Sequence, residues 1–555
     1  MPLLNRKRLC LALGFTAAIA LAACSGPTSE AAKSSAMAIK EPDGGTPKRL
    51  RLLTADQYLN TLAYVFGPDV SPETRFAPMT RTGGLLSVGT SLGGVTDAQM
   101  EQYQKTASAV ATQVTNAGNR GTLVPCTPAD AKAADPACAA TFIAGVGRLL
   151  YRQPLTAARS KEFVDEAGEA AVRLKDFYAG LGVALEGMLL SPKVLLVTET
   201  SEPDPKNPGR ERLDAYSYAT RLSLFLWNAA PDDALLKAAE SGELNTDQGR
   251  AKVVERMLTS PRLEAGMRAF FDDMFAFDDF NNLAKDNSIY PVFTGVTAAD
   301  AREQTLRTVI DQLITKKKDY RDLFTTRETF ISPSLAALYR LPASPGWTPY
   351  EFPADSPRVG LLTQVSFLSV HSHPGRSSAT LRGKALREIL LCQTVPRPPA
   401  NVDFSAVENP PPNLKTARQR VGAHLSTPVC AGCHKITDPM GLALENFDGA
   451  GQYRDQDNGA PIDITGVLDG KEFSTVAQLG TVLHDHPQLP SCLVKRVFSY
   501  GTGSLTTAKD KDILAYLDAR FAANGYRLPD LLRTIALSRA FSEVAPPPVK
   551  TAAAN

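Results

Sequence analysis

The sequence predicts a mainly α protein that is divided into several helical modules and contains little β structure. Alanine and leucine are frequent, whereas Phe, Trp and Tyr make up only 7% of the residues, and this balance favours helix over a sheet-rich sandwich or barrel. A hydrophobic fraction of 43% and a charged fraction of 21% are those of an ordinary globular protein, which excludes a disordered, a collagen-like and a polytopic membrane chain. Single cores stop growing near ~250–300 residues, so a chain of 555 residues is expected to contain several modules.

Residues 1–23 have the layout of a secretory signal peptide. A basic cluster, Arg6–Arg8, precedes an apolar run, Leu9–Ala20, that is too short to span a bilayer permanently. The residues before Cys24 resemble a bacterial lipobox, in which cleavage leaves a lipid-modified Cys24 as the new N-terminus; the alternative is a plain signal peptide with a leftover thiol. Ser25 stands where Asp would mark inner-membrane retention. We therefore expect a lipid anchor in the outer membrane, with the protein facing the periplasm or the cell surface.

Removal of the signal peptide changes the charge balance of the chain. The formal net charge falls from +2 to −1, because the segment holds three basic residues and no acidic one. A chain without excess positive charge is not expected to bind nucleic acid. Export also places the cysteines in an oxidising compartment, where disulfides are stable. With Cys24 assigned to the lipid, the remaining cysteines are Cys126, Cys138, Cys392, Cys430, Cys433 and Cys492.

The N-terminal part is expected to consist of a tether and a helical module. Residues 24–48 are rich in Ser, Ala, Gly, Pro, Lys and Glu, so they cannot bury enough surface to fold and are expected to be a disordered tether. Residues 49–125 form a first helical module. Thr54 and Gln57 make a capping box before an apolar helical repeat, and Gly67 is a stop signal after it.

Two further helical modules follow. In the first, 126–205, Cys126 and Cys138 flank a short Pro- and Asp-containing loop that we expect a disulfide to close. The second, 206–345, contains a strongly apolar segment, 221–227, that is expected to be buried within a series of helices.

The C-terminal part is expected to hold two modules and a tail. The first, 346–458, contains a stretch from Pro353 to Pro412 that is rich in Pro, Ser and Thr and should be irregular apart from one helix near 381–391. The second, 459–545, should contain a short hairpin around 465–470 followed by helices. Residues 546–555 are expected to be a disordered tail.

A C-x-x-C-H motif lies in the first of these C-terminal modules, at 430–434. Its spacing lets two thiols bond to the two vinyl groups of a haem while the adjacent imidazole becomes the proximal iron ligand. With 8 Cys and 6 His in the chain, chance would produce the pattern with a probability on the order of one in a thousand. The motif predicts one covalent haem c, attached to Cys430 and Cys433 and ligated through iron by His434. The alternatives are a Cys430–Cys433 disulfide and a zinc site, although no second C-x-x-C or H-x-x-x-H lies nearby.

The second axial position of the iron is less well defined. Met440, the one methionine after the motif, would have to reach the opposite haem face over a very short span. We prefer His424 or His373 as the distal ligand, although each histidine alone is more often a surface residue than a ligand. An axial His in place of Met would lower the reduction potential, and an open position would permit peroxide chemistry. The other histidines are His371, His484 and His486.

Hydrolytic chemistry has no recognisable set of residues in the sequence. Glu445 and Asp448 lie close together, but two acids in a turn usually cap backbone groups or pair with an arginine, which here is expected to be Arg454.

Blocks along the chain resemble a group of secreted planctomycete and myxobacterial proteins, which consist of five consecutive domains of unknown function and are often labelled cytochrome-c-like. The strongest block, HLSTPVCAGCHKITDPMGLALENFDGAGQYR (424–454), contains the C-x-x-C-H motif. The resemblance covers nearly all of the chain after the signal peptide. The other blocks are RLLTADQYLNTLAYVFG (51–67), GRLLYRQPL (147–155) with MLLSPKVLL (188–196), RLSLFLWNAAPDDALLKAAESGEL (221–244), GLLTQVSFLSVHSHPGRSSATLRGKALREILLC (360–392), and ITGVLDGKEF (464–473) with CLVKRVFSYGTGSL (492–505).

The resemblance implies a mainly α, multi-module helical protein with a C-terminal cytochrome-c-like haem module. It implies haem attachment to Cys430 and Cys433 and iron ligation by His434, and it makes His424 a haem-pocket residue without establishing its role. The chain departs from the group's pattern at two places outside the motif, where 378–380 replaces a Ser-Pro pair and Ser504 replaces an arginine.

The resemblance also suggests a second disulfide. Cys392 and Cys492 lie in two separate blocks of the group, and we expect a bond between them to join the two C-terminal modules.

These observations lead to one main functional hypothesis and two alternatives. The main hypothesis is an exported, lipid-anchored monohaem c-type protein that transfers electrons, or performs a haem-dependent redox step, with an unidentified redox partner at the cell envelope. The first alternative is a non-catalytic binding or structural lipoprotein, because a large helical body around one motif is unusual for a simple carrier. The second is an enzyme acting on polysaccharide, since the group is often found in polymer-degrading bacteria, but no paired carboxylates are identifiable.

Overall fold

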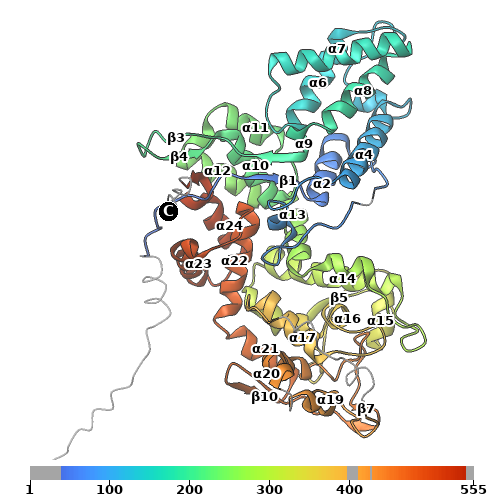
Figure 1. Ribbon diagram of the computed structural model, residues 1–555, viewed down its shortest axis with the longest axis vertical. Coiled ribbons are helices and arrows are strands. Elements are labelled where there is room, and N and C mark those ends of the chain that lie inside the picture. Colours follow the sequence, from blue (N-terminus) through green and yellow to red (C-terminus); the bar gives the residue numbers. More distant parts are fainter. Residues whose placement is uncertain (1–38, 75, 397–410, 426–427, 546–555) are drawn as a thin grey trace, which may run out of the picture.

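The computed structural model describes residues 39–74, 76–396, 411–425 and 428–545 (Figure 1). In these ranges the chain is mainly helical, and its strands form small antiparallel sheets of two or three strands, which confirms the predicted fold class. The helices form an upper, a central and a lower group along the long axis of the molecule (Figure 1). Within the same ranges, no helix combines the length and the apolar character that crossing a membrane requires.

The upper group packs around a core that both predicted N-terminal modules share. As predicted, Thr54 and Gln57 form a capping box, and the helix that they start ends at Gly67, which has a φ of 90°. The Cys126–Cys138 disulfide closes the loop before the next long helix. The elements are β1 (Leu50–Leu52), α2 (Ala55–Phe66), α4 (Asp97–Thr115), α5 (Arg120–Leu123), α6 (Pro136–Leu150), α7 (Ala157–Leu174), α8 (Phe177–Leu189), α9 (Pro192–Leu195) and β2 (Leu196–Thr198). The short helix α3 (Leu86–Gly89) falls in this part of the sequence but packs against the central group.

The central group combines two segments that are far apart in the sequence, 201–282 and 488–544. The segment 221–227 is buried as predicted, on a helix that packs against helices of both segments. One hydrophobic cluster runs from Leu85 to Phe541 and therefore spans several predicted modules. The elements are β3 (Ser201–Pro203), β4 (Glu211–Leu213), α10 (Ala215–Trp227), α11 (Asp233–Glu240), η1 (Glu243–Asn245), α12 (Asp247–Leu258), α13 (Arg262–Met274), η2 (Phe277–Asn282), α22 (Gln488–Thr502), η7 (Ala508–Asp510), α23 (Lys511–Ala523), α24 (Leu528–Leu537), α25 (Arg539–Ser542) and β11 (Glu543–Val544).

The lower group carries the C-x-x-C-H motif and three two-stranded antiparallel sheets, one of which is a hairpin where the sequence predicts it, around 465–470. The helical elements are α14 (Gly295–Ile310), η3 (Asp311–Thr315), η4 (Tyr320–Phe324), α15 (Pro333–Tyr339), η5 (Leu361–Thr363), α16 (Val365–Val370), α17 (Ala379–Ala385), η6 (Leu386–Leu390), α19 (Ala417–His424), α20 (Pro428–Leu442) and α21 (Val476–His484). The strands are β5 (Glu328–Ile331), β6 (Thr348–Glu351), β7 (Gln456–Asp457), β8 (Ala460–Pro461), β9 (Gly466–Leu468) and β10 (Lys471–Phe473).

Segments near the two ends of the described chain lie side by side. Thr46 forms a parallel bridge with Val544, and its hydroxyl accepts a hydrogen bond from the buried guanidinium of Arg221 at 2.9 Å. Arg221 also pairs with the buried carboxylate of Glu199 at 2.6 Å. Part of the predicted tether, 24–48, is therefore packed. Composition alone could not show this, because the contacts come from the opposite end of the chain.

A second disulfide ties the lower group to the central group. The bond between Cys392, just after η6, and Cys492, on α22, closes a sequence separation of 100 residues. The expected link between the two C-terminal modules is thus present. The predicted lipidation site, Cys24, and the predicted tail, 546–555, lie outside the described residues.

Candidate haem site

The two motif cysteines and the motif histidine lie on α20. Cys430, Cys433 and His434 are spaced i, i+3 and i+4, so a helix places all three on one face. Both cysteines are half-buried, and neither takes part in a disulfide, so the structure holds them as two thiols. The Sγ atom of Cys433 lies 3.3 Å from the carbonyl oxygen of Pro396. A helical C-x-x-C-H face with two thiols is the donor set that covalent haem attachment needs.

His434 is paired with a buried carboxylate one turn further along the same helix. Its Nδ1 atom lies 2.6 Å from Oδ2 of Asp438, whose side chain is only 3% exposed. The hydrogen bond to Asp438 raises the pKa of His434 above its usual value, while partial burial of the imidazole acts in the opposite direction. The pair orients the imidazole ring relative to α20.

Two hydroxyl groups hold the second oxygen of that carboxylate. Thr380, from α17, donates to Oδ1 of Asp438 at 2.8 Å, and Thr437 donates to the same oxygen at 3.0 Å. The Thr380 hydroxyl is also 3.5 Å from Nδ1 of His434. Asp438 therefore has defined partners on both oxygens, and α17 takes part in positioning the imidazole.

A cavity of about 750 Å³ lies beside His434, between α19, α20 and the hairpin of β9 and β10. Its volume is in the range of ~300–1,000 Å³ that is usual for sites of small molecules and cofactors. Leu425 and Val467 line it and are both 40% exposed, so a ligand in the cavity would cover two large apolar side chains. The apolar lining residues are Val421, Leu425, Pro439, Leu442, Val467 and Phe473, and Arg418, Lys435 and Glu472 are the charged ones besides Asp438.

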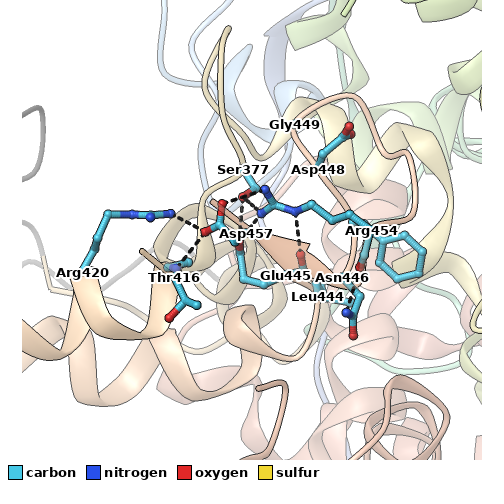
Figure 2. A network of polar contacts seen from close by, with 12 residues as sticks. Ser377, Thr416, Arg420, Leu444, Glu445, Asn446, Asp448, Gly449, Arg454 and Asp457 are labelled. Atoms are coloured by element: carbon cyan, nitrogen blue, oxygen red, sulfur yellow. Dashed lines mark hydrogen bonds and ion pairs between the residues drawn. The ribbon is translucent and has the colours of Figure 1, made fainter. Parts of the chain in front are cut away.

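A polar network fixes the start of α19, a helix that forms one wall of the cavity (Figure 2 shows the network). The carboxylate of Asp457 accepts hydrogen bonds from the backbone N–H of Ala417, the first residue of α19, at 3.0 Å and from Arg420 at 2.7 Å. Arg454 bridges Asp457 and Glu445, at 3.1 Å and 3.0 Å. The predicted pairing of Glu445 with Arg454 is thus present, and it connects α19 to the chain that follows α20.

The structure separates the candidate distal ligands into several environments. His373 lies in the loop before α17, where its carbonyl accepts a hydrogen bond from Lys285 at 3.1 Å, and it does not line the cavity beside His434. His424 ends α19, a wall of that cavity, but its side chain lies outside the described residues. The choice of either as distal ligand stays a prediction.

The other candidates are engaged elsewhere. Met440 is fully buried in the largest hydrophobic cluster. His371 is half-buried, and loss of solvation lowers its pKa to about 3. His484 and His486, at the end of α21, pair with Asp485 and Asp469.

The residues present fit a haem better than a bare metal ion. Among the described residues, no group of three or more His, Cys, Asp and Glu side chains could hold a metal ion by itself. A haem iron takes its equatorial nitrogens from the porphyrin and needs only axial ligands from the protein. One oriented imidazole, two thiols on the same helical face and an apolar cavity beside the imidazole meet that requirement.

Two parts of this site were not predicted from the sequence. The cavity wall from Thr465 to Gln478 lies beyond the predicted haem module, 346–458, since it comes from the next hairpin and the start of α21. The pairing of Asp438 with His434 was not predicted either, although their i, i+4 spacing in a helical segment is a signal that could have shown it.

Four family models match the chain. All four are described as proteins of unknown function: DUF1587 at residues 51–116, DUF1592 at 213–341, DUF1588 at 358–457 and DUF1585 at 469–541. The chain contains these four domains in succession. The DUF1588 model, with the short name PSCyt3, covers the C-x-x-C-H motif and Asp438. No curated protein and no solved structure gives a significant match. The fifth domain implied by the resemblance, around 126–205, and the assignment to particular bacteria stay predictions.

Proposed function

We propose that this chain is an exported monohaem c-type protein that transfers electrons, or carries out a haem-dependent redox step, at the outer membrane. The observation that carries the proposal is the common face of α20, where two thiols and an oriented imidazole lie next to an apolar cavity. The match of the DUF1588 domain, whose short name refers to a cytochrome, supports the same function.

Each residue of the site has a part in this function. Cys430 and Cys433 would bond covalently to the haem, and His434 would ligate the iron from one side. The haem supplies a one-electron Fe(III)/Fe(II) couple. The apolar wall with Leu425 and Val467 would exclude water from the face of the ring, and this raises the reduction potential relative to an exposed ring.

The cellular address is part of the proposal. The basic cluster, the short apolar run and Cys24 support export and lipid attachment, and Ser25 supports the outer membrane. Metabolic labelling with a palmitate analogue tests the anchor. Label in the wild-type chain and none in Cys24→Ala is expected, whereas equal label in both contradicts a lipid on Cys24.

A redox titration tests the function. The full chain without its signal peptide, produced with a cytochrome c maturation system, should show a reversible one-electron couple whose oxidised spectrum reports the spin state. A low-spin spectrum indicates that the sixth position is filled and favours a carrier, while a high-spin spectrum with peroxide turnover favours a catalyst. A chain that binds haem but shows no reversible couple and no turnover would contradict the proposal and leave a structural lipoprotein.

A further inference from the structure

We propose that Asp438 is a positioning residue for His434, which holds the imidazole in a single tautomer and makes it a more electron-donating ligand for iron. The inference rests on the proposed haem site and deepens it, because it assigns the control of the site's reduction potential to a carboxylate outside the C-x-x-C-H motif.

The contact with Asp438 determines the tautomer of His434. A neutral imidazole carries one N–H and one nitrogen with a lone pair, and a carboxylate next to Nδ1 requires the N–H to be there. The separation of 2.6 Å between Nδ1 of His434 and Oδ2 of Asp438 is that of a short, charge-assisted hydrogen bond. The lone pair is then on Nε2, the nitrogen that an iron ligand uses when Nδ1 is the donor.

The carboxylate of Asp438 is held in place by its surroundings. Its side chain is buried, its Oδ1 accepts from Thr380 and Thr437, and it is four residues from His434 on a continuous helix. Thr380 is brought there by the close crossing of α17 over α20. A Cβ at Gly383 would be 1.8 Å from the carbonyl oxygen of Thr437, so the two backbones are in direct contact.

The carboxylate of Asp438 also changes the electronic character of His434 as an iron ligand. A carboxylate that accepts the Nδ1 proton raises the basicity of the imidazole as a ligand, and a more basic axial ligand stabilises Fe(III) relative to Fe(II). The hydroxyl of Thr380 acts against this effect, because it donates to the same carboxylate and withdraws part of its charge. Removing the carboxylate's charge and removing the hydroxyl must therefore shift the reduction potential in opposite directions.

The test is the midpoint potential of the haem-loaded full chain and two variants. Asp438→Asn should favour Fe(II) at least tenfold, which is a positive shift of 59 mV or more for a one-electron couple. Thr380→Val should give a smaller negative shift. Asp485→Asn is the matched control, since it removes an Asp–His contact of 2.7 Å on the exposed end of α21, and it should leave the potential unchanged.

The outcome separates an electronic role from a structural one. An unchanged potential in Asp438→Asn, or shifts of the same sign in both variants, would overturn the inference while leaving the haem site intact. A second measurement does not depend on haem: the ¹⁵N spectrum of the histidine-labelled full chain near pH 9, where imidazoles are neutral. The Nδ1–H tautomer of His434, assigned with His434→Gln, supports the inference, and the Nε2–H tautomer overturns it even if the chain takes up no haem.

Discussion

Gly441 of α20 lies against the backbone of Ala379 in α17, so closely that a Cβ atom at this glycine would be 1.7 Å from the carbonyl oxygen of Ala379. Only a residue without a side chain allows the two helices to approach to this distance. The approach brings Thr380, the next residue of α17, to the carboxylate of Asp438. The crossing of α17 and α20 thereby connects a packing feature to the orientation of His434.

A methyl group at this crossing should disturb the haem site. Gly441→Ala is expected to push α17 away from α20, to lower the free energy of unfolding by about 1–3 kcal/mol and to reduce the haem content. Urea unfolding and the absorbance ratio of haem to protein measure the two effects. Gly145→Ala, on α6, is the control, because a Cβ there meets nothing within 4 Å and the residue lies outside the haem motif. If both variants had the same free energy of unfolding and the same haem content, the close crossing of α17 and α20 would have no role in the haem site.

The apolar wall of the cavity beside His434 should be needed to cover the haem. Val467→Asp places a carboxylate on this wall, and covering that carboxylate with a haem would remove the water that solvates its charge. We expect the haem content to fall several-fold, while the stability of the haem-free chain changes by no more than about 0.5 kcal/mol, since Val467 is half-exposed there.

Leu505→Asp provides the comparison for this variant. Leu505 is 47% exposed, and it does not line the cavity. Its substitution should leave the haem content unchanged. A normal haem content in Val467→Asp would show that the haem does not occupy this cavity.

The two disulfides should differ in their contribution to stability. Cys392–Cys492 closes a separation of 100 residues and Cys126–Cys138 one of 12. In the chain-entropy model a 100-residue loop is worth about 4.7 kcal/mol and a 15-residue loop about 3 kcal/mol. Urea unfolding of Cys392→Ala/Cys492→Ala should therefore show the larger loss. A larger loss for Cys126→Ala/Cys138→Ala would contradict this order.

Asp518, on α23, should make stability depend on pH. Burial raises the pKa of its carboxyl from 3.8 to about 6, although a hydrogen bond from Ser491 acts against this shift, and one carboxylate oxygen has no hydrogen-bond partner in the structure. The folded state thus binds the proton more tightly than the unfolded state. Its stabilising contribution is complete below about pH 4 and is lost as the pH rises through 6.

Removing this carboxyl should make the chain more stable at neutral pH. Asp518→Asn is expected to gain about 1 kcal/mol over the wild type at pH 7.5, after allowance for the partial exposure of the group, and nothing at pH 4. Thermal unfolding at both pH values measures the difference. Asp455→Asn, an exposed acid, should show no such dependence on pH. A gain of equal size at both pH values would mean that the carboxyl does not titrate in this window.

Local signals were sufficient for much of the helical structure. The start of α2 follows from Thr54 and Gln57 and its end from Gly67, because caps depend on neighbours within one turn. The hairpin of β9 and β10 follows from Asp469-Gly470, whose positive φ angles suit a tight turn.

Long-range packing could not be predicted in the same way. The bridge of Thr46 to Val544 and the shared core of α10 and α22 join segments that are hundreds of residues apart, and nothing in local composition specifies such partners. For the candidate site, the motif singled out Cys430, Cys433 and His434, and the structure places all three on α20; their role as haem donors stays a prediction. The cavity wall at Val467 depends on where a later hairpin folds back, and it could only be seen in three dimensions.

The proposed function depends on one haem that is covalently bound through Cys430 and Cys433. The most direct measurement is the mass of the proteolytic peptide that holds both cysteines, taken from the chain produced with a cytochrome c maturation system, together with its pyridine haemochrome spectrum. We expect a peptide heavier by the mass of one haem, a c-type spectrum, and the loss of both in Cys430→Ala/Cys433→Ala. A peptide of unmodified mass with two thiols, or with a disulfide between them, would contradict this covalent attachment.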